Sequence, residues 1–241
     1  MNRNEFFPAL PLTKLQLRLT HAALEICTDD IEDVHVMATG SQAEVDTLRI
    51  HAAADTLTVE QPLGKKSSGR WLQVVIRLPR SWKGAISART HSGWMNLRSL
   101  SGTDLALATV SGAILASDLR FITLAARTLT GDVKLTQAIC DRCSLFSVSG
   151  GLSALDVQLK TARAATLTST VHYSLTAPFE TLSLASLAGD LCLDAPIILC
   201  DAALRSASGH LRTEGVSIVD SGPKVRAITL TSDLDITSTI D

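Results

Sequence analysis

Short runs of alternating apolar and polar residues follow one another along most of the chain. Asp132-Val133-Lys134-Leu135 is one such run, with an apolar side chain at every second position. This period of two is typical of β-strands that bury one face. No long stretch keeps apolar residues at the helical spacing of i, i+3, i+4 and i+7 without a break. The pattern therefore predicts an all-β protein.

A small turn motif recurs at a nearly fixed interval through the second half of the chain. Successive copies are 19 residues apart in four intervals and 20 apart in two. The copies are Ser92-Gly93, Ser111-Gly112, Thr130-Gly131, Ser149-Gly150, Ser169 in place of the glycine, Ala188-Gly189 and Ser208-Gly209. We attribute the glycine to a left-handed or tightly bent backbone at each corner.

Two columns of apolar residues accompany this turn. Two places after the glycine stand Met95, Ile114, Val133, Leu152, Val171, Leu191 and Leu211. Two places before it, six of seven residues are apolar: His91, Val110, Leu129, Val148, Leu167, Leu187 and Ala207. We interpret both columns as inward-facing, with Ser and Thr such as Ser147 pointing outward.

A repeat of 19 to 20 residues is too short to bury its own apolar face, so successive copies must stack and share a core. The sequence predicts a β-solenoid with one coil per repeat, about 4.8 Å apart. Residues 1–90 are β-rich but less regular, and we interpret them as opening coils or a cap. They continue into regular coils over 91–241, the whole being one structural domain. The period breaks at Ser221-Gly222-Pro223, after which residues 228–236 supply a last coil.

Several of these segments resemble a known family. Leu24-Glu25-Ile26, Thr56-Leu57-Thr58-Val59 and Val75-Ile76-Arg77-Leu78-Pro79 precede tandem turns of which Thr128 to Leu135 is the most regular. Their order resembles the bacterial "putative adhesin" β-solenoid domains of unknown function, from about residue 13 to the end. The resemblance implies a right-handed, single-stranded β-helix without an established enzymatic activity.

Charge and composition argue against several classes of partner. The chain has 241 residues, 22 basic and 24 acidic, for a net charge of -2, which gives no field to attract a nucleic acid or an anionic membrane. Aromatic residues make up 4% and are scattered, so no base-stacking surface is evident. We expect no nucleic-acid partner, no direct membrane span and an unknown protein or surface partner.

The cysteines suggest the compartment. Their number is odd, and the given chain opens without a secretory signal pattern. The five are Cys27, Cys140, Cys143, Cys192 and Cys200. We expect free thiols in a reducing cytoplasmic setting, or a cell-surface or membrane-associated location if the chain is a fragment.

The candidate metal, redox and phosphate motifs are weak. Cys140 and Cys143 have the spacing of a zinc or redox pair, but Cys200 lies three coils away and Cys192 falls near the inward column of Leu135. Gly64-Lys65-Lys66-Ser67 lacks the remainder of a phosphate loop. The six histidines, at positions 21, 35, 51, 91, 172 and 210, occupy different repeat positions. We expect no metal and no cofactor.

Paired carboxylates are the remaining candidates, because some stacked solenoids cleave polysaccharides. Asp132, Asp190 and Asp233 share the position after the turn glycine, and Asp118 and Asp156 share another position two coils apart. We interpret these as corner acids that bond to their own turns, and predict no catalytic residue. The sequence favours a non-enzymatic interaction or structural module, with a carbohydrate-active β-helix enzyme, a lyase or glycosidase, as the alternative.

The ends of a solenoid expose unpaired strand edges. The segment from Ile236 to Asp241 is β-prone and contains no proline. We therefore expect a homodimer, if one forms, to use the C-terminal edge of the solenoid.

Overall fold

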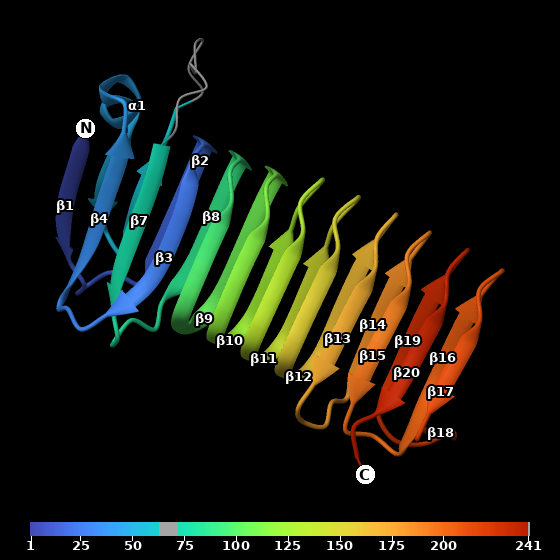
Figure 1. Ribbon diagram of the computed structural model, residues 1–241. Coiled ribbons are helices and arrows are strands. Elements are labelled where there is room, and N and C mark those ends of the chain that lie inside the picture. The colour runs from blue at the N-terminus through green and yellow to red at the C-terminus, as the bar shows by residue number, and fades with distance from the viewer. Residues whose placement is uncertain (63–71, 241) are drawn as a thin grey trace.

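The chain forms one elongated stack of β-strands, with a short helix near its N-terminal end (Figure 1). The computed structural model describes residues 1–62 and 72–240. Within these residues 20 strands are joined by hydrogen bonds, and α1, Gln42–Thr47, is the one helix. The predicted all-β, solenoid-like fold is confirmed.

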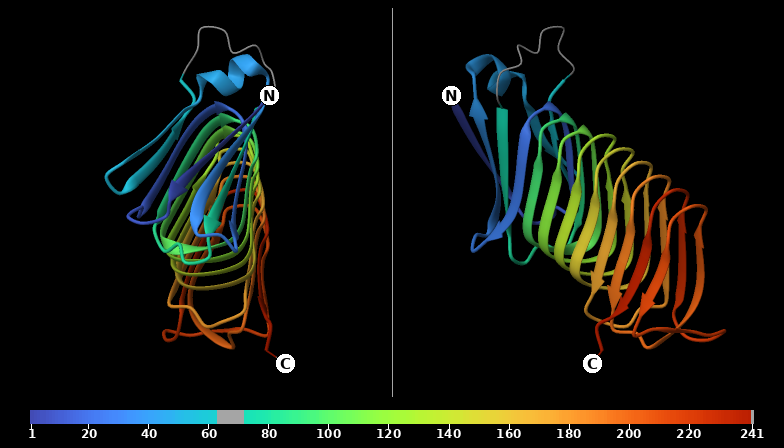
Figure 2. Two further views of the ribbon diagram at one scale, coloured as in Figure 1. Left: turned by 90° about the vertical axis from the view of Figure 1, so that its left-hand side faces the viewer. Right: turned by 45° about the vertical axis from the view of Figure 1, so that its right-hand side comes forward.

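Four long strands build the regular middle of the stack. They are β9 (Met95–Ser111), β10 (Ile114–Arg127), β11 (Val133–Phe146) and β12 (Leu152–Thr166). They pair in parallel at an offset of 19 residues, so that Ile114 lies between Met95 and Val133. The inward and outward alternation shifts at one residue of positive φ in each strand: Ser99, Asp118, Gln137 and Asp156. It shifts again a few residues later, as between Ile122 and Thr123 in β10. These two shifts and the glycine turn give each coil its flattened outline (Figure 2).

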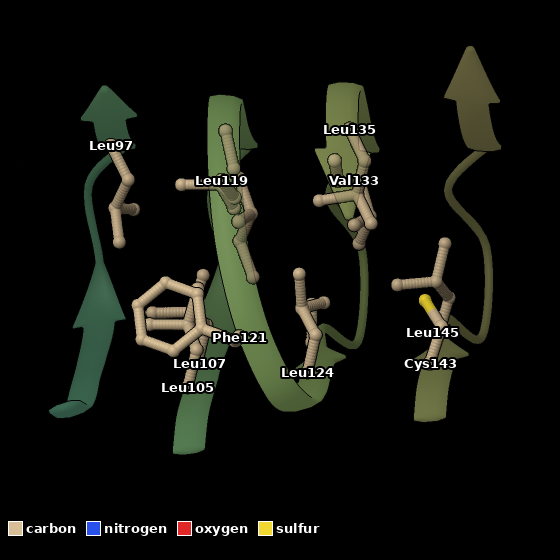
Figure 3. Packing of buried hydrophobic residues seen from close by; sticks show 14 of the residues in the cluster. Leu97, Leu105, Leu107, Leu119, Phe121, Leu124, Val133, Leu135, Cys143 and Leu145 are labelled. Atoms are coloured by element: carbon tan, nitrogen blue, oxygen red, sulfur yellow. The ribbon is translucent and has the colours of Figure 1, made fainter. Parts of the chain in front are cut away.

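The interior is a continuous stack of mainly aliphatic side chains, with Phe121 and Cys143 among them (Figure 3). The column two places after the turn glycine is inward-facing as predicted, since its first six members, from Met95 to Leu191, are at most 1% exposed. Its seventh member, Leu211, is 49% exposed because it lies in the last coil of the stack. One buried cluster extends from Leu12 to Ile236.

The second apolar column faces solvent, so the prediction that it points inward is wrong. The residues that point inward are the hydroxyl residues one place earlier: Thr90, Thr109, Thr128, Ser147, Thr166 and Ser186, each at most 7% exposed. Ser206, at the same place before Ala207, is only partly buried because it lies in the last coil of the stack. Thr229 occupies the equivalent place before Leu230 and is 3% exposed. Ser147 shows why: its Oγ donates to the Gly131 carbonyl at 3.2 Å and accepts from the Gly150 amide at 2.8 Å. A buried hydroxyl at this position can bond backbone groups of two neighbouring turns, which an aliphatic side chain cannot do. Thr109 and Thr229 are exceptions, since their Oγ1 atoms have no hydrogen-bond partner among the described residues.

Close stacking, rather than a left-handed backbone, accounts for most of the turn glycines. A Cβ added to Gly131 would lie 1.9 Å from the Gly112 carbonyl oxygen, and one added to Gly150 would lie 1.9 Å from that of Gly131. Among the turn glycines only Gly93 has a positive φ, so the left-handed backbone that was one of the two predicted reasons holds there alone.

Gly150→Ala is therefore expected to lower the free energy of unfolding by about 1 to 3 kcal/mol, because a backbone must shift to admit the methyl group. The adjacent Gly151 is a matched control, since its added Cβ would meet no atom closer than 3.6 Å. Gly151→Ala should change the free energy by less than about 1 kcal/mol. Urea denaturation of both variants compares them, and equal losses would contradict the close-stacking explanation.

The N-terminal part is less regular and contains antiparallel pairs. Its strands are β1 (Asn2–Pro8), β2 (Lys14–His21), β3 (Ala23–Asp29), β4 (Asp33–Gly40), β5 (Arg49–Ala53), β6 (Thr56–Glu60), β7 (Leu72–Pro79) and β8 (Ala85–Ser92). β2 lies between β6 and β8, and β3 lies between β7 and β9. Outside them, β1–β4, β4–β7 and β5–β6 are antiparallel. The boundary predicted at residue 90 falls inside β8, which is paired on both sides.

The C-terminal part is built from shorter strands. They are β13 (Val171–Leu175), β14 (Thr181–Ser186), β15 (Leu191–Ala195), β16 (Leu199–Ser206), β17 (Leu211–Glu214), β18 (Ser217–Ile218), β19 (Lys224–Thr229) and β20 (Leu234–Ser238). We name β16–β17 the terminal coil and β19–β20 the inserted coil. β19 pairs with both β14 and β16, and β20 pairs with both β15 and β17.

The last coil in the sequence is thus not the last coil in space. Figure 1 shows the inserted coil, in red, between neighbours coloured orange. The prediction that the segment from Ile236 to the C-terminus forms the free edge is therefore wrong: Ile236 is 2% exposed, and its strand is hydrogen-bonded on both sides. The chain passes outward through the terminal coil and returns through Ser221-Gly222-Pro223 into the gap, with Gly222 at a φ of 98°.

Candidate functional site

A ladder of exposed aliphatic side chains follows the turn edge of the stack, and we name it the apolar ridge. Its members are Val110, Leu129, Val148, Leu167, Leu187 and Leu230, of which Leu129, Leu167, Leu187 and Leu230 are each 45 to 48% exposed. Backbone hydrogen bonds join ridge residues of adjacent coils. The Leu167 amide donates to the Val148 carbonyl at 3.1 Å, and the Leu230 amide donates to the Leu187 carbonyl at 3.3 Å.

The buried hydroxyl ladder places these side chains outside. Because Thr128 points into the core to bond the Gly131 amide at 3.0 Å, the next residue along the extended chain, Leu129, must point outward. The same alternation holds at Ser147 and Val148 and at Thr166 and Leu167. Because the hydroxyl residue points inward, the residue after it points outward. This alternation does not require that the outward residue be aliphatic.

A neighbouring column, apolar except for the exposed Arg127, lies beside the ridge. Two residues earlier in each coil stand Ala108, Arg127, Phe146, Ala165, Ala185 and Ile228, paired in register by the parallel strands. Phe146 is 42% exposed and Ile228 is 54% exposed. The ridge thus extends over six coils, about 24 Å at strand spacing. Single exposed apolar residues are ordinary on protein surfaces, whereas contiguous apolar patches mark interaction sites.

The aspartates after the turn glycine act as backbone caps between coils. The Gly151 amide donates to Asp132 Oδ1 at 2.8 Å, and the Asp233 amide donates to Asp190 Oδ1 at 3.1 Å. The His210 amide and side chain both bond Asp233, at 2.8 and 3.3 Å, and these bonds hold the pKa of that carboxyl below its usual value. Each acid bonds a neighbouring coil, so the prediction that these acids bond their own turns is wrong.

The second pair of acids, Asp118 and Asp156, sits at the strand bends. Both residues have positive φ, at 52° and 55°. Asp tolerates this left-handed region better than most residues, because its short side chain can bond locally. The two side chains are exposed and belong to coils separated by one intervening coil.

The inserted coil brings together acids that the sequence order separates. It places Asp235 beside Cys192 of β15. Asp194, also in β15, forms a hydrogen bond with His172 Nε2 at 2.9 Å. Burial first, and then Asp235, Asp190 and Asp194, raise the pKa of the Cys192 thiol. Cys192 is half-buried on the outer surface, so the prediction that it faces the core is wrong; its register partner His172 also points outward.

Two cavities lie away from the acids around the inserted coil, whereas a smaller one of 210 Å³ is lined by Asp118 together with Arg80 and Arg120. One of 650 Å³ lies at the N-terminal end, lined mainly by apolar groups that include Leu12 and Trp82. Another, of 270 Å³, is lined in part by Cys140, Asp141 and Lys160. Neither receives a cluster of carboxylates in the manner of a glycoside-cleaving site.

The remaining sequence candidates stand as follows. All five cysteines are free, and Cys140 and Cys143 are buried thiols beside the hydroxyl of Tyr173, which lies 4.0 Å from Cys143 Sγ. The hydrogen bond between the two thiols lowers the pKa of Cys140 and raises the pKa of Cys143. Over residues 1–62 and 72–240, no three His, Cys, Asp or Glu residues group to hold a metal ion. The Gly64–Ser67 segment lies outside the described residues.

Two histidines do meet, which the repeat positions had not indicated. The rings of His21 and His91 pack edge to face with centroids 5.9 Å apart. They meet because β2 is inserted beside β8, a pairing that a comparison of repeat positions cannot reveal. In the described part of the chain, no helix has the length and apolarity needed to cross a membrane.

A protein-family model decides the relationship of the chain to known proteins. The model of the Toastrack DUF4097 family matches residues 12–221. The chain belongs to the Toastrack DUF4097 family. This confirms the resemblance inferred from the sequence, and the family is one of unknown function. No curated protein matches the chain.

Solved structures resemble this Toastrack chain over nearly its full length. A putative adhesin from Bacteroides fragilis has 13% identity and a TM-score of 0.62, with 99% of this chain and 97% of that chain covered. A putative adhesin from Parabacteroides distasonis has 11% identity and a TM-score of 0.60, with coverage of 98% and 97%. A putative lipid binding protein from the same species has 12% identity, a TM-score of 0.52 and coverage of 98% and 96%. At these identities the likeness establishes the fold alone.

Proposed function

We propose that this Toastrack DUF4097 chain is a non-enzymatic interaction module that docks a partner protein along the apolar ridge. The single observation that carries the proposal is the run of partly exposed aliphatic side chains over six successive coils, four of them 45 to 48% exposed. Exposing this much apolar surface is costly in water unless another surface covers it. The proposal includes a right-handed, single-stranded winding of the coils, which the family resemblance implies.

A protein is favoured over a lipid surface by the charges beside the ridge. Asp132, Asp190 and Asp233 each lie three residues after a ridge leucine, at the same turn edge. Carboxylates at that position are repelled by the negative surface potential of anionic membranes. A partner with an apolar groove and a basic or hydrogen-bonding rim fits both features.

The second candidate is a carbohydrate-active enzyme, supported by the acids that gather around the inserted coil. Against it, His210 stabilises the ionised form of Asp233, whereas a general acid needs its pKa raised. Incubation with a panel of acidic and neutral polysaccharides tests this candidate, because release of new reducing or unsaturated ends would support it.

Replacing ridge leucines tests the leading proposal. The triple variant Leu129→Ser, Leu167→Ser and Leu187→Ser removes three of the six ridge side chains. Leu115→Ser, Ile122→Ser and Ile139→Ser removes three exposed apolar side chains elsewhere as a matched control. Each is used as bait in cells that express the protein, with quantitative mass spectrometry. We expect proteins bound by the parent and the control to fall at least about tenfold on the ridge variant, as for loss of central interface residues.

Circular dichroism and melting curves must first show that both triple variants are folded. A parent, control and ridge variant that retain the same proteins equally would contradict the proposal. Equal binding of parent and ridge variant to vesicles would exclude lipid as the cause of any difference, and a ridge-dependent loss of vesicle binding alone would contradict docking to a protein.

A further inference from the structure

The two ends of the stack differ in how the coils stop. At the N-terminal end the chain changes to antiparallel pairs, β1–β4 and β5–β6, and α1 lies beside them (Figure 2). At the other end the terminal coil keeps the parallel arrangement of the coils before it. Within the described residues, Asp201–Ser206 and Leu211–Glu214 are each paired along one edge only. Such edges are open to pairing with another strand.

The core is also left open at this end. Ala202 and Leu204 point inward from β16 but remain only partly buried, because no coil covers them. Leu211 is 49% exposed, although its six equivalents in earlier coils are at most 1% exposed. A further layer with the same cross-section would bury these side chains.

We propose that a second copy of this chain supplies that layer, with the two terminal coils in contact through a two-fold axis. The axis passes through both sheets, so that β16 pairs antiparallel with β16 of the second copy and β17 with β17. A register centred on Ala203 places Ala202 opposite Leu204 of the second copy, a small residue against a large one, on the inward side. A two-fold contact repeats each such pair twice.

In this register the outward charges of β16 lie opposite charges of the other sign on β16 of the second copy. Asp201, Ala203 and Arg205 alternate with the inward residues, and the two-fold axis places Asp201 opposite Arg205 of the second copy. β17 has the same property, because a centre at Thr213 places Arg212 opposite Glu214 of the second copy. None of these four residues forms a salt bridge within the described chain.

One axis can serve both strands. Ala203 lies five residues before Ser208, and Thr213 lies four residues after Gly209, so the two centres are almost equally far from the turn that joins the strands. They therefore lie nearly opposite each other on the two sheets of the flattened coil. A strand pair of another protein would have to carry charges complementary to both β16 and β17, whereas a second copy of this chain provides both sets by symmetry.

Single charge-reversal variants, and a double variant that restores the opposite charges, test the inference. Asp201→Arg would place two arginines opposite each other twice, and Arg205→Asp would place two aspartates opposite each other twice. The double variant Asp201→Arg with Arg205→Asp restores both pairs. Within one chain these two residues are about 13 Å apart along the strand, so the rescue reports contact between copies.

Sedimentation equilibrium of the full chain at low salt measures the outcome. We expect a dimeric parent, a dissociation constant raised roughly tenfold or more by each single change, recovery in the double variant, and smaller differences in high salt. Lys134→Asp, on another coil, and the folded ridge variant should both remain dimeric. A monomeric parent, single variants with unchanged association, or a double variant as weak as the single variants would overturn the inference.

Discussion

Val133→Asp should lower the free energy of unfolding by about 4 kcal/mol or more, which is a large part of the stability of a typical domain. Val133 is fully buried between Ile114 and Leu152 in the inward column, where Figure 3 shows it beside Leu135. A carboxylate at this position has no partner. Thermal and urea denaturation of the purified variant measure the loss.

Two comparisons make this prediction specific. Lys134→Asp, one residue away on an exposed side chain, should change stability by less than about 0.5 kcal/mol. Burial would raise the pKa of the new carboxyl at 133, so the folded state would hold more protons than the unfolded state. The deficit of Val133→Asp should therefore grow as the pH rises above about 4 and shrink toward that pH. Equal melting temperatures for the two variants would refute the register of the coils.

Ile236→Lys should also destabilise the protein severely, by about 3 kcal/mol or more, because it buries a lysine. Ile236 is 2% exposed, and its register neighbours are Leu193 in β15 and Thr213 in β17. The order of coils read from the sequence predicts a different result, a stable protein with a changed edge. Circular dichroism melting distinguishes the two outcomes.

Ile240→Lys is the matched control for the inserted coil. Ile240 is 46% exposed and lies after the end of β20, so its replacement should leave the melting temperature within a few degrees of the parent. If both lysine variants melt like the parent, the coil formed by β19 and β20 is not enclosed between two neighbours.

The sequence predicted the strands and the first inward column because one periodic requirement controls them. Val133 and its equivalents must be apolar in every coil, since each lies between two copies of itself in a dry core. Such a column repeats without exception and can be read from spacing alone. Leu211 fits the same column, and only its position at the end of the stack leaves it exposed.

The inside and outside of the turn were reversed because apolarity was the only criterion. Leu129 looks like a core residue and Thr128 looks like a surface residue, yet the hydroxyl is needed inside to bond the turn backbone. A usable signal was present: the position three places before the glycine is Thr or Ser in all seven copies of the turn. A polar column of such regularity indicates a repeated hydrogen bond as strongly as an apolar column indicates a core.

The order of the coils could not be read from the sequence. Strand edges of neighbouring coils offer the same backbone groups, so β20 can pair beside β15 or beyond β17 without any change in its alternation. The encounter of Asp190 with Asp233, and of His21 with His91, depends on these insertions. The charge pattern of β16 acquires meaning only once this strand is known to be the edge.

Photo-crosslinking from the ridge tests the proposed function most directly. A photoreactive amino acid is placed at Leu167 on the ridge or at Ile139, which is similarly exposed but lies off it, and the protein is irradiated in the cells that express it. We predict a discrete adduct with another protein from position 167 that is missing from position 139. An adduct pattern that is the same from both positions, or no adduct from position 167, would contradict the assignment of the apolar ridge as the docking surface.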